Sequence, residues 1–321
     1  LRCDPPYLSI VVVTYASEAT IAPCLKSIAM ASQSLPIHVE VIVIDNCSPD
    51  DTASIVQKHF QWVQLVQNSA NLGYARAVNR GINIARGRYV FILNPDCTIE
   101  RDTLKNLVTF ADTHPDVGII GPQLLNPDGT LQPSGRRAIT LIPLIASLLG
   151  LHELINRSLL GAQRCYGIMR DVEEVSGAAM FCRRDAVVSV GGMDERFFLY
   201  FEDVDLCLRM RAANWRVVYY PHARIRHIHR HSTTRFPNIT HVAFIHSAWV
   251  YLRKHCGSWS AVCWRFVVIL REGLLLMAMG IAGIFWHTNW RKHWLALNAL
   301  WSEDVTIDTT ARVTTQPLAG S

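Results

Sequence analysis

Two carboxylates directly follow apolar, β-branched stretches of the chain. Asp96 comes after Leu93-Asn94-Pro95, and Asp45 follows Ile42-Val43-Ile44. A carboxylate placed like Asp96 can bind Mg²⁺ or Mn²⁺, with a diphosphate supplying further oxygen ligands. Asp45 can accept a hydrogen bond from a pyrimidine imide N–H or a ribose hydroxyl. The alternatives are a helix cap or turn residue for Asp96 and an Asx turn for Asp45.

A pair of adjacent acids, Glu202 and Asp203, follows the aromatic run 197–201. An apolar wall raises the pKa of a carboxyl group, which suits a general base that acts on a hydroxyl. Because adjacent side chains point in different directions, one acid can face a substrate while the other orients a neighbour. The alternative is that both acids lie in the first turn of a helix, where negative charge is favourable.

Histidine and arginine alternate densely between Arg224 and Ser232. In an extended backbone alternate residues share a face, so His227, His229 and His231 would line one side. One of these imidazoles could bind a metal, and the arginines between them could neutralise a departing diphosphate. A single histidine is usually structural, but so dense a cluster favours a functional site.

The elements that must position these residues alternate along the first half of the chain. Apolar runs predict buried strands at 8–14, 39–44, 63–66 and 89–93, and helical spacing predicts helices at 18–32, 49–60, 74–85 and 102–113. Ser48 is expected to cap the second helix, with Pro49 in its first turn. This order predicts an α/β, Rossmann-like fold with a mostly parallel sheet and helices on both faces. Ligands bind beyond the carboxyl ends of such strands, which directs attention to Thr14-Tyr15, Asp45-Asn46 and Asn94-Pro95-Asp96.

Composition limits the class of protein. Half of the 321 residues are apolar, which favours a folded chain, and the net charge of +5 is too mild to indicate a nucleic-acid partner. The nine cysteines show no Cys-x-x-Cys pair or metal-finger spacing, so we expect reduced thiols. The N-terminal residues lack the apolar run of a secretory signal, and a cytoplasmic location is expected.

The segment from Thr240 onward differs from the rest. Seven tryptophans alternate there with lysine and arginine, and the uncharged stretch Gly273 to Trp286 is shorter than the roughly 20 residues that span a bilayer. We expect residues 239–302 to form helices that lie in the membrane interface. The alternative is helices that pack on the catalytic domain or on a second subunit, as in a homodimer. Residues 303–321 are expected to be a disordered tail.

Eight segments between residues 8 and 235 occur in the order found in a known family. The chain resembles the family 2 glycosyltransferases with the GT-A fold, and in particular their bacterial rhamnosyltransferase-like branch. The matching segments are Ser9 to Tyr15, Val43 to Asp50, Asn71 to Gly81, Leu93 to Asp96, Ser176 to Ala178, Gly191 to Phe198, Glu202 to Leu206 and His227 to Ser232.

This resemblance implies a catalytic domain over residues 1–238 and a role for each motif. Asp96 would be the last acid of the family's Asp-x-Asp metal motif, in which Asn94 replaces the first. His227 would be the second metal ligand, with His229 as its rival. Asp203 would be the catalytic base, with Glu202 beside it. The implied donor-binding residues are Thr14, Tyr15 and Asp45 at the nucleoside, Asn71 and Gly73 in the donor pocket, Asn94 and Gly177, and Ser232 at the phosphates.

The resemblance further implies an inverting, metal-dependent transferase that works in cell-surface glycan synthesis. Its donor would be dTDP-L-rhamnose, with a UDP-hexose as the alternative, and its acceptor a hydroxyl of a lipid-linked or polysaccharide glycan. The enzyme would be peripheral on the inner face of the cell membrane.

Three other functions fit less well. A processive polysaccharide synthase would carry a Gln-x-x-Arg-Trp motif and several membrane spans, and the sequence shows neither. A nucleotidyltransferase would have a glycine-rich loop where Thr14-Tyr15-Ala16-Ser17-Glu18 stands. A non-catalytic sugar-nucleotide-binding scaffold would have no need of Asp96, Asp203 and His227.

Overall fold

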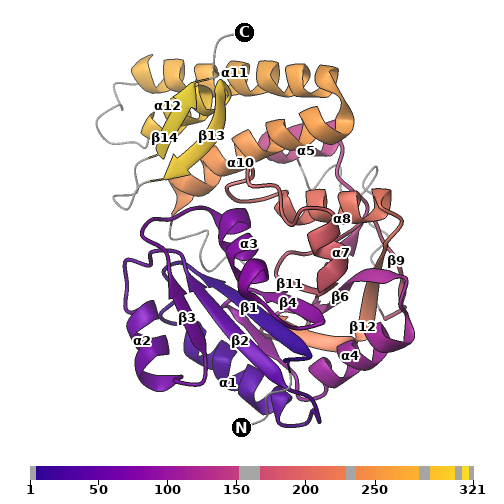
Figure 1. The fold of residues 1–321 in the computed structure, drawn as a ribbon. Helices are drawn as coiled ribbons and strands as arrows, with labels where there is room; N and C mark the ends of the chain where they lie inside the picture. Colours follow the sequence, from indigo (N-terminus) through magenta and orange to yellow (C-terminus); the bar gives the residue numbers. More distant parts are fainter. Residues whose placement is uncertain (1–4, 152–166, 229–235, 282–289, 308–312, 318–321) are drawn as a thin grey trace. The chain divides into compact units, whose positions relative to one another are not determined.

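The computed structural model describes residues 5–151, 167–228, 236–281, 290–307 and 313–317 (Figure 1). The chain forms two compact units. The first comprises residues 1–138, 163–194 and 202–232, and the second comprises 139–162, 195–201 and 233–321. Seven of the nine cysteines lie in the described residues, and none of these seven forms a disulfide.

A central mixed sheet organises the first unit. Its strand order is β3 (Gln64–Gln67), β2 (Val39–Asp45), β1 (Leu8–Thr14), β4 (Tyr89–Leu93), β11 (Ala179–Arg183), β6 (Val117–Leu125), β12 (Arg216–His227) and β5 (Cys97–Ile99). Pairing is parallel from β3 through β4 and between β6 and β12, whereas β11 is antiparallel to both its neighbours and β5 is antiparallel to β12. The predicted α/β fold is confirmed. The antiparallel insertion of β11 was not visible in the sequence, because buried strands of either direction are apolar runs.

Helices cover the sheet on both faces. Side chains alternate in direction along β1, so Leu8, Ile10 and Val12 join one apolar cluster while Val11 and Val13 join another. The first cluster contains side chains of α1 (Ile21–Ser32), α2 (Thr52–His59) and α4 (Thr103–Thr113), and the second contains side chains of α3 (Tyr74–Ile84), α7 (Arg184–Ser189) and α8 (Glu202–Ala212). Short strands β7 (Leu131–Gln132), β8 (Gly135–Arg136), β9 (Arg170–Asp171) and β10 (Glu174–Val175) complete the unit.

The start of α2 differs from the prediction. The helix begins at Thr52, and neither Ser48 nor Pro49 belongs to it. Ser48 instead donates its hydroxyl hydrogen to Oδ1 of Asp45 at 2.6 Å, and its own Oγ accepts from the N–H of Ala16 at 3.1 Å. The serine therefore links two strand ends instead of capping the helix.

The second unit is mainly helical. It contains α5 (Leu141–Leu148), α10 (Pro237–Tyr251), the π-helical turn η1 (Leu252–Cys256), α11 (Ser258–Ile281) and α12 (Trp290–Ala299). The fully buried Trp264 of α11 donates its indole N–H to the carbonyl of Ile245 in α10 at 3.1 Å. Among the described residues, no helix combines the length and the apolar character that crossing a membrane requires.

Strands β13 (Ser302–Ile307) and β14 (Val313–Pro317) form an antiparallel pair. We expected a disordered tail over residues 303–321, and these two strands depart from that expectation. Valine, isoleucine and threonine are frequent in both segments, and β-branched residues favour extended backbone.

Candidate active site

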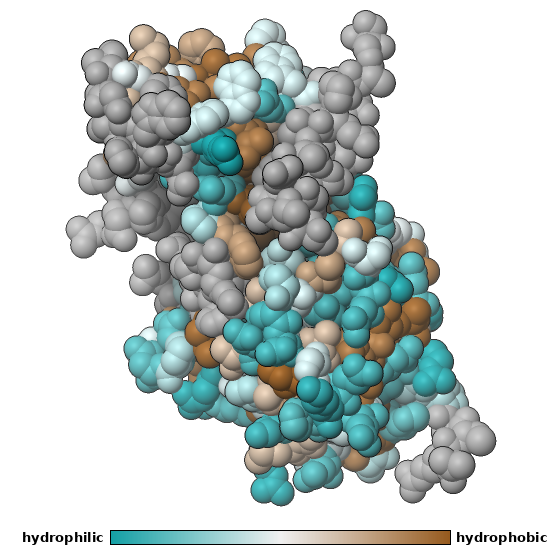
Figure 2. All heavy atoms as spheres, turned by 90° about the vertical axis from the view of Figure 1, so that its left-hand side faces the viewer, coloured by the Kyte–Doolittle hydropathy of each residue, from teal (hydrophilic) through white to brown (hydrophobic). Residues whose placement is uncertain are grey.

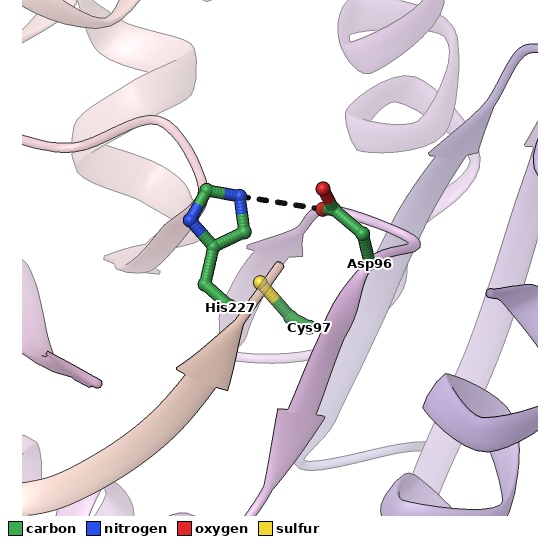
Figure 3. Close-up of side chains that lie close together, drawn as sticks. All are labelled: Asp96, Cys97 and His227. Atoms are coloured by element: carbon green, nitrogen blue, oxygen red, sulfur yellow. Dashed lines mark ion pairs between the residues drawn. The ribbon is translucent and has the colours of Figure 1, made fainter. Parts of the chain in front are cut away.

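Asp96 and His227 lie against each other at one edge of the sheet. Asp96 is in the turn between β4 and β5, and His227 ends β12, directly opposite Cys97 in the β12–β5 ladder. The Nε2 atom of His227 is 3.3 Å from Oδ1 of Asp96, and both side chains are buried (Figure 3). The N–H of Ile228 donates to the carbonyl of Asp96 at 3.0 Å, which fixes the two segments to each other.

Gln132 orients the imidazole of His227. Its Oε1 lies 2.7 Å from Nδ1 of His227, and its own amide nitrogen donates to Asn126 at 3.2 Å. The glutamine oxygen can only accept, so Nδ1 carries a proton and Nε2 is the nitrogen that faces Asp96. A carboxylate oxygen and an imidazole nitrogen that face each other in this way suit a divalent cation.

Cys97 is the third potential ligand in this cluster. Burial raises the pKa of its thiol well above the ordinary value, and the nearby charge of Asp96 raises it further. Its Sγ lies 3.4 Å from the carbonyl of Ala178, to which the thiol donates. A protonated thiol is a poor ligand for Mg²⁺ or Mn²⁺, so the chemistry of the cluster rests on Asp96 and His227.

The acid pair opens helix α8. Oδ2 of Asp203 accepts from the N–H of Gly177 at 2.7 Å, and Oδ1 accepts from the N–H of Val204 at 2.9 Å. Asp203 is half-buried, whereas Glu202 is buried. Burial, followed by the charge of Asp203, raises the pKa of Glu202 well above its ordinary value. The pair therefore combines a buried acid, whose raised pKa favours its protonated form, with a half-buried carboxyl group that solvent or a substrate can reach.

The alternative expectation for these acids also applies, since both lie in the first turn of α8. The backbone before the helix is unusual. Tyr200 and Phe201 have φ angles of 72° and 67°, a left-handed conformation that non-glycine residues rarely adopt. Arg209 anchors the helix by pairing with Asp205 at 2.7 Å and donating to the carbonyl of Val190 at 2.6 Å.

Tyr74 lies between the Asp96 cluster and the acid pair. Its hydroxyl is 3.0 Å from Oδ1 of Asn94 and 3.2 Å from the carbonyl of Gly177. Burial raises the pKa of Tyr74 well above its ordinary value, and the charges of Glu202, Asp203 and Asp96 add to this effect. The Tyr74 hydroxyl thus contacts Asn94, two residues before Asp96, and Gly177, whose N–H binds Asp203.

The predicted nucleoside-binding residues form a second group at the ends of β1 and β2. The hydroxyl of Thr14 donates to Oδ1 of Asp45 at 2.9 Å, and the N–H of Ser48 donates to Oδ2 at 3.1 Å. The alternative expected for Asp45, an Asx turn, would use the N–H two residues on, whereas the observed bond comes from Ser48, three residues on. Tyr15 is half-buried, and its burial raises the pKa of the phenol.

Asn46 connects this group to the donor-pocket residues Asn71 and Gly73. Its amide nitrogen donates to Oδ1 of Asn71 at 2.8 Å and to the carbonyl of Gly73 at 3.2 Å, and its Oδ1 accepts from the N–H of Leu72 at 3.0 Å. Gly73 has a φ angle of 85° immediately before α3. Sequence reasoning noted Asn46 only as a residue that follows a strand, not as the centre of this network.

Sequence reasoning also missed an ion pair near Asp203, between the buried Glu174 and the exposed Arg136. Glu174 and Arg136 are 2.8 Å apart, and the charge of Asp203 influences both. Burial raises the pKa of Glu174 to about 7, although Arg136 opposes this shift. No motif marks these residues, which lie in the irregular region 121–174. The other predicted residues of the basic cluster, His229 and Ser232, fall outside the described residues.

Comparison with known proteins identifies the family of the chain. The model of the glycosyl transferase family 2 matches residues 9–177. The N-acetylglucosaminyl-diphospho-decaprenol L-rhamnosyltransferase of Mycobacterium tuberculosis is 33% identical over 275 residues, which cover 79% of this chain and 87% of the relative.

Solved structures share the fold at lower identity. The mannosyltransferase PcManGT from Pyrobaculum calidifontis, in complex with GDP-Man and Mn²⁺, superposes with a TM-score of 0.54 at 17% identity, over 93% of this chain and 88% of that one. Residues 1–349 of S. aureus TarS with UDP give a TM-score of 0.51 at 18% identity, over 92% and 80%. These neighbours confirm the expected GT-A fold. From the match to the family model and the 33% identity to a relative, we conclude that the chain belongs to glycosyl transferase family 2, a family of inverting glycosyltransferases.

Proposed function

We propose that this glycosyltransferase moves L-rhamnose from dTDP-L-rhamnose onto a hydroxyl of a polyprenyl-diphosphate-linked saccharide in cell-surface glycan synthesis. The observation that carries the proposal is the alignment, over 79% of the chain, with a relative named for rhamnosyl transfer to N-acetylglucosaminyl-diphospho-decaprenol. The alignment with this relative covers 79% of the chain, whereas the family model matches only residues 9–177. The similarity to the relative therefore continues beyond the part that the family model describes.

Asp203 is the proposed catalytic base. Two backbone N–H groups hold its carboxylate at 2.7 and 2.9 Å, and its half-buried position leaves it open to an acceptor. It accepts the proton of the acceptor hydroxyl while that oxygen forms a bond to the anomeric carbon. The bond from this carbon to the diphosphate oxygen breaks in the same displacement, so the anomeric configuration inverts and the nucleoside diphosphate leaves.

Glu202 has a supporting role in this proposal. Among the described residues, its Oε2 has no hydrogen-bond partner, and burial raises its pKa well above the ordinary value, which favours the protonated form. We therefore assign the role of the base to Asp203 and not to Glu202. If both adjacent acids were ionised, each negative charge would raise the pKa of the other, and the two could not be told apart as the base and its neighbour.

Asp96 and His227 are the proposed ligands of Mg²⁺ or Mn²⁺. Their buried oxygen and nitrogen atoms face each other at 3.3 Å, and Gln132 holds the proton of the imidazole on the far nitrogen. The bound cation would neutralise negative charge on the donor diphosphate. Asn94 lacks the charge of the usual first acid, and its Oδ1 accepts from Tyr74, so fewer carboxylates surround the cation than in an Asp-x-Asp motif.

The group around Thr14, Tyr15 and Asp45 is the proposed nucleoside site, with Asn71 and Gly73 beneath the donor. Internal hydrogen bonds hold the carboxylate of Asp45, and carboxylate oxygens retain capacity for one more donor such as a thymine or uracil imide. Gly177 and Asn94 flank Tyr74 next to Asp203, where the sugar would lie.

We further infer that helix α11 binds a membrane surface, which would keep the protein peripheral on the inner face of the cell membrane. Apolar side chains recur every three or four residues along its exposed side, with Trp259 83% exposed and Phe266 67% exposed. Figure 2 shows apolar atoms gathered at the surface of the helical unit. Interfacial helices have such a face. The face comprises Trp259, Val262, Phe266, Leu270, Leu274 and Met277.

A transfer assay tests the proposed reaction. The purified protein would be incubated with a synthetic N-acetylglucosaminyl-diphospho-prenol and, separately, dTDP-L-rhamnose, UDP-glucose and UDP-N-acetylglucosamine. We expect rhamnosyl product only, with inverted configuration by NMR, and no product after chelation of divalent metal. Transfer from a UDP-sugar instead would refute the donor assignment, and transfer with retention would refute the role of Asp203.

A sedimentation assay with anionic vesicles tests the membrane proposal. We expect the wild-type protein to sediment with vesicles and the double variant Trp259→Glu/Phe266→Glu to remain in the supernatant. Met30 on α1 is also an exposed apolar residue, at 65%, so Met30→Glu is the matched control. Equal sedimentation of all three proteins would refute the assignment to α11.

A further inference from the structure

A second cluster of metal-ligating side chains lies inside the helical unit. Three helices contribute one residue each: His241 from α10, Glu272 from α11 and His293 from α12. One ligand atom of each residue lies within 4.8 Å of the others. The cluster shares no residue with the Asp96–His227 site, and the glycosyltransferase reaction described above does not use it.

The cluster is enclosed. Glu272 is completely buried and His293 is 5% exposed, while His241 is half-buried. Glu272 lies on the inner side of α11, opposite the exposed apolar side chains, together with Ala261, Trp264 and Val268. An acid at such a position on an otherwise apolar helix face costs free energy unless cations compensate its charge.

The distances fit a tetrahedral cation. Nε2 of His241 lies 3.4 Å from Oε1 of Glu272, and Nδ1 of His293 contacts Oε2 directly. Ligands bound to tetrahedral zinc at about 2.0–2.1 Å are themselves about 3.3–3.4 Å apart. The distance between His241 and Glu272 matches this ligand-to-ligand distance. The atoms of Glu272 and His293 that are now in direct contact would move apart when a cation binds between them.

One ligand atom is left without a hydrogen bond. Nε2 of His241 is buried, and within the described residues its contact with Oε1 of Glu272, at 3.4 Å, is too poorly aligned to count as a hydrogen bond. Buried polar atoms of this kind are rare and usually indicate a missing water, ion or partner. Arg271 also contacts Glu272, which offers an alternative in which protonated histidines and Arg271 alone balance the carboxylate.

We propose that His241, Glu272 and His293 form a binding site for Zn²⁺ that fastens α10, α11 and α12 together. Two imidazoles and one carboxylate favour Zn²⁺ over the hard cations Mg²⁺ and Mn²⁺. Because each ligand comes from a different helix, the ion would join three elements through one point. Water would fill the fourth position.

Metal content and metal affinity test this site. Untagged protein would be stripped with a chelator, titrated with Zn²⁺ against a chromophoric chelator and analysed by mass spectrometry for bound metal. All proteins would carry Asp96→Asn, so that the first site does not contribute. We expect one tightly bound Zn²⁺ and a higher melting temperature with Zn²⁺ than without. In Glu272→Gln we expect the affinity for Zn²⁺ to fall by more than the roughly 10–100-fold that loss of an outer-shell partner causes.

Two further variants guard against a folding artefact. His241→Gln changes a half-buried ligand and is expected to reduce Zn²⁺ affinity even if Glu272→Gln does not fold. His255→Ala removes a histidine of η1 outside the cluster and should bind Zn²⁺ like the parent protein. The proposal fails if the parent binds no Zn²⁺, if Glu272→Gln and His241→Gln retain it, or if the melting temperature depends on pH but not on Zn²⁺, as the charge network alone would require.

Discussion

Asp203 and Glu202 are adjacent carboxyl groups of similar size, yet we predict very different consequences when each is replaced by its amide. Asp203→Asn removes the proposed base. Glu202→Gln replaces a buried acid, whose raised pKa favours its neutral form, with a neutral amide of nearly the same shape. Comparing the two variants therefore separates proton transfer from side-chain packing.

The structure sets the expected magnitudes. A positioned general base contributes about 10²–10⁴-fold, so Asp203→Asn should lower kcat by this factor, equivalent to about 3–5.5 kcal/mol in the barrier. Asparagine has one oxygen, so it can accept from Gly177 or from Val204 but not from both, and the lost bond costs about 1–3 kcal/mol of stability. Glu202→Gln should retain activity within about tenfold, or about 1.4 kcal/mol.

The assay is rhamnosyl transfer at saturating donor, with thermal melting and dTDP binding measured on the same preparations. Unchanged dTDP binding in Asp203→Asn would exclude misfolding as the cause of lost turnover. The reasoning would be refuted if Glu202→Gln lost as much activity as Asp203→Asn, because the ionised base would then have been assigned to the wrong acid.

Three further predictions concern the surroundings of Asp203. Gly177→Ala places a methyl group 3.0 Å from Oδ2 of Asp203, so kcat should fall while the melting temperature changes little, and an unchanged kcat would show that Asp203 tolerates displacement. Tyr74→Phe leaves buried acceptors on Asn94 and Gly177 without the hydroxyl, so urea unfolding should show a loss of about 1–3 kcal/mol, and equal stability would contradict this role of the hydroxyl. Glu174 has its pKa raised from 4.5 to about 7, so the native state binds the proton more tightly than the unfolded chain, and the free energy of unfolding should fall by about 3 kcal/mol as pH rises through this window. Glu174→Gln should remove that dependence, and its persistence in the variant would assign the titration to another group.

The sequence was most informative where a strand is buried on both faces. The apolar runs predict β1 and β4 at their observed ends, and β2 within a residue, because both faces of these strands require apolar side chains. The predicted start of α2 was wrong because the side chain of Ser48 can either cap a helix or, as observed, bridge Asp45 and Ala16. Local sequence does not show which of these the tertiary structure selects.

Some residues of the candidate site could likewise be predicted from the sequence, and others could not. Asp96, His227 and Asp203 could be predicted as site residues because each stands in a short motif, and the motifs occur in a recognisable order. Gln132 and Tyr74 orient or connect these residues but have no motif of their own. Their roles depend on contacts between segments far apart in the chain, such as β7 with the end of β12, and spacing along one segment cannot reveal such contacts.

The ladder between β4 and β11 pairs Leu93 with Ala179, one residue before Asn94 and two residues after Gly177. Asn94, two residues before Asp96, and Gly177, which binds Asp203, therefore lie close together at the ends of two adjacent strands, although residues 95–176 lie between them in the chain. Surface loops in that intervening segment can change in length without altering this spacing, whereas β6 and Gln132, which support β12 and His227, cannot. Insertion of a single residue at Asn94 or Ala178 would be far more damaging, because it would shift one half of the site against the other.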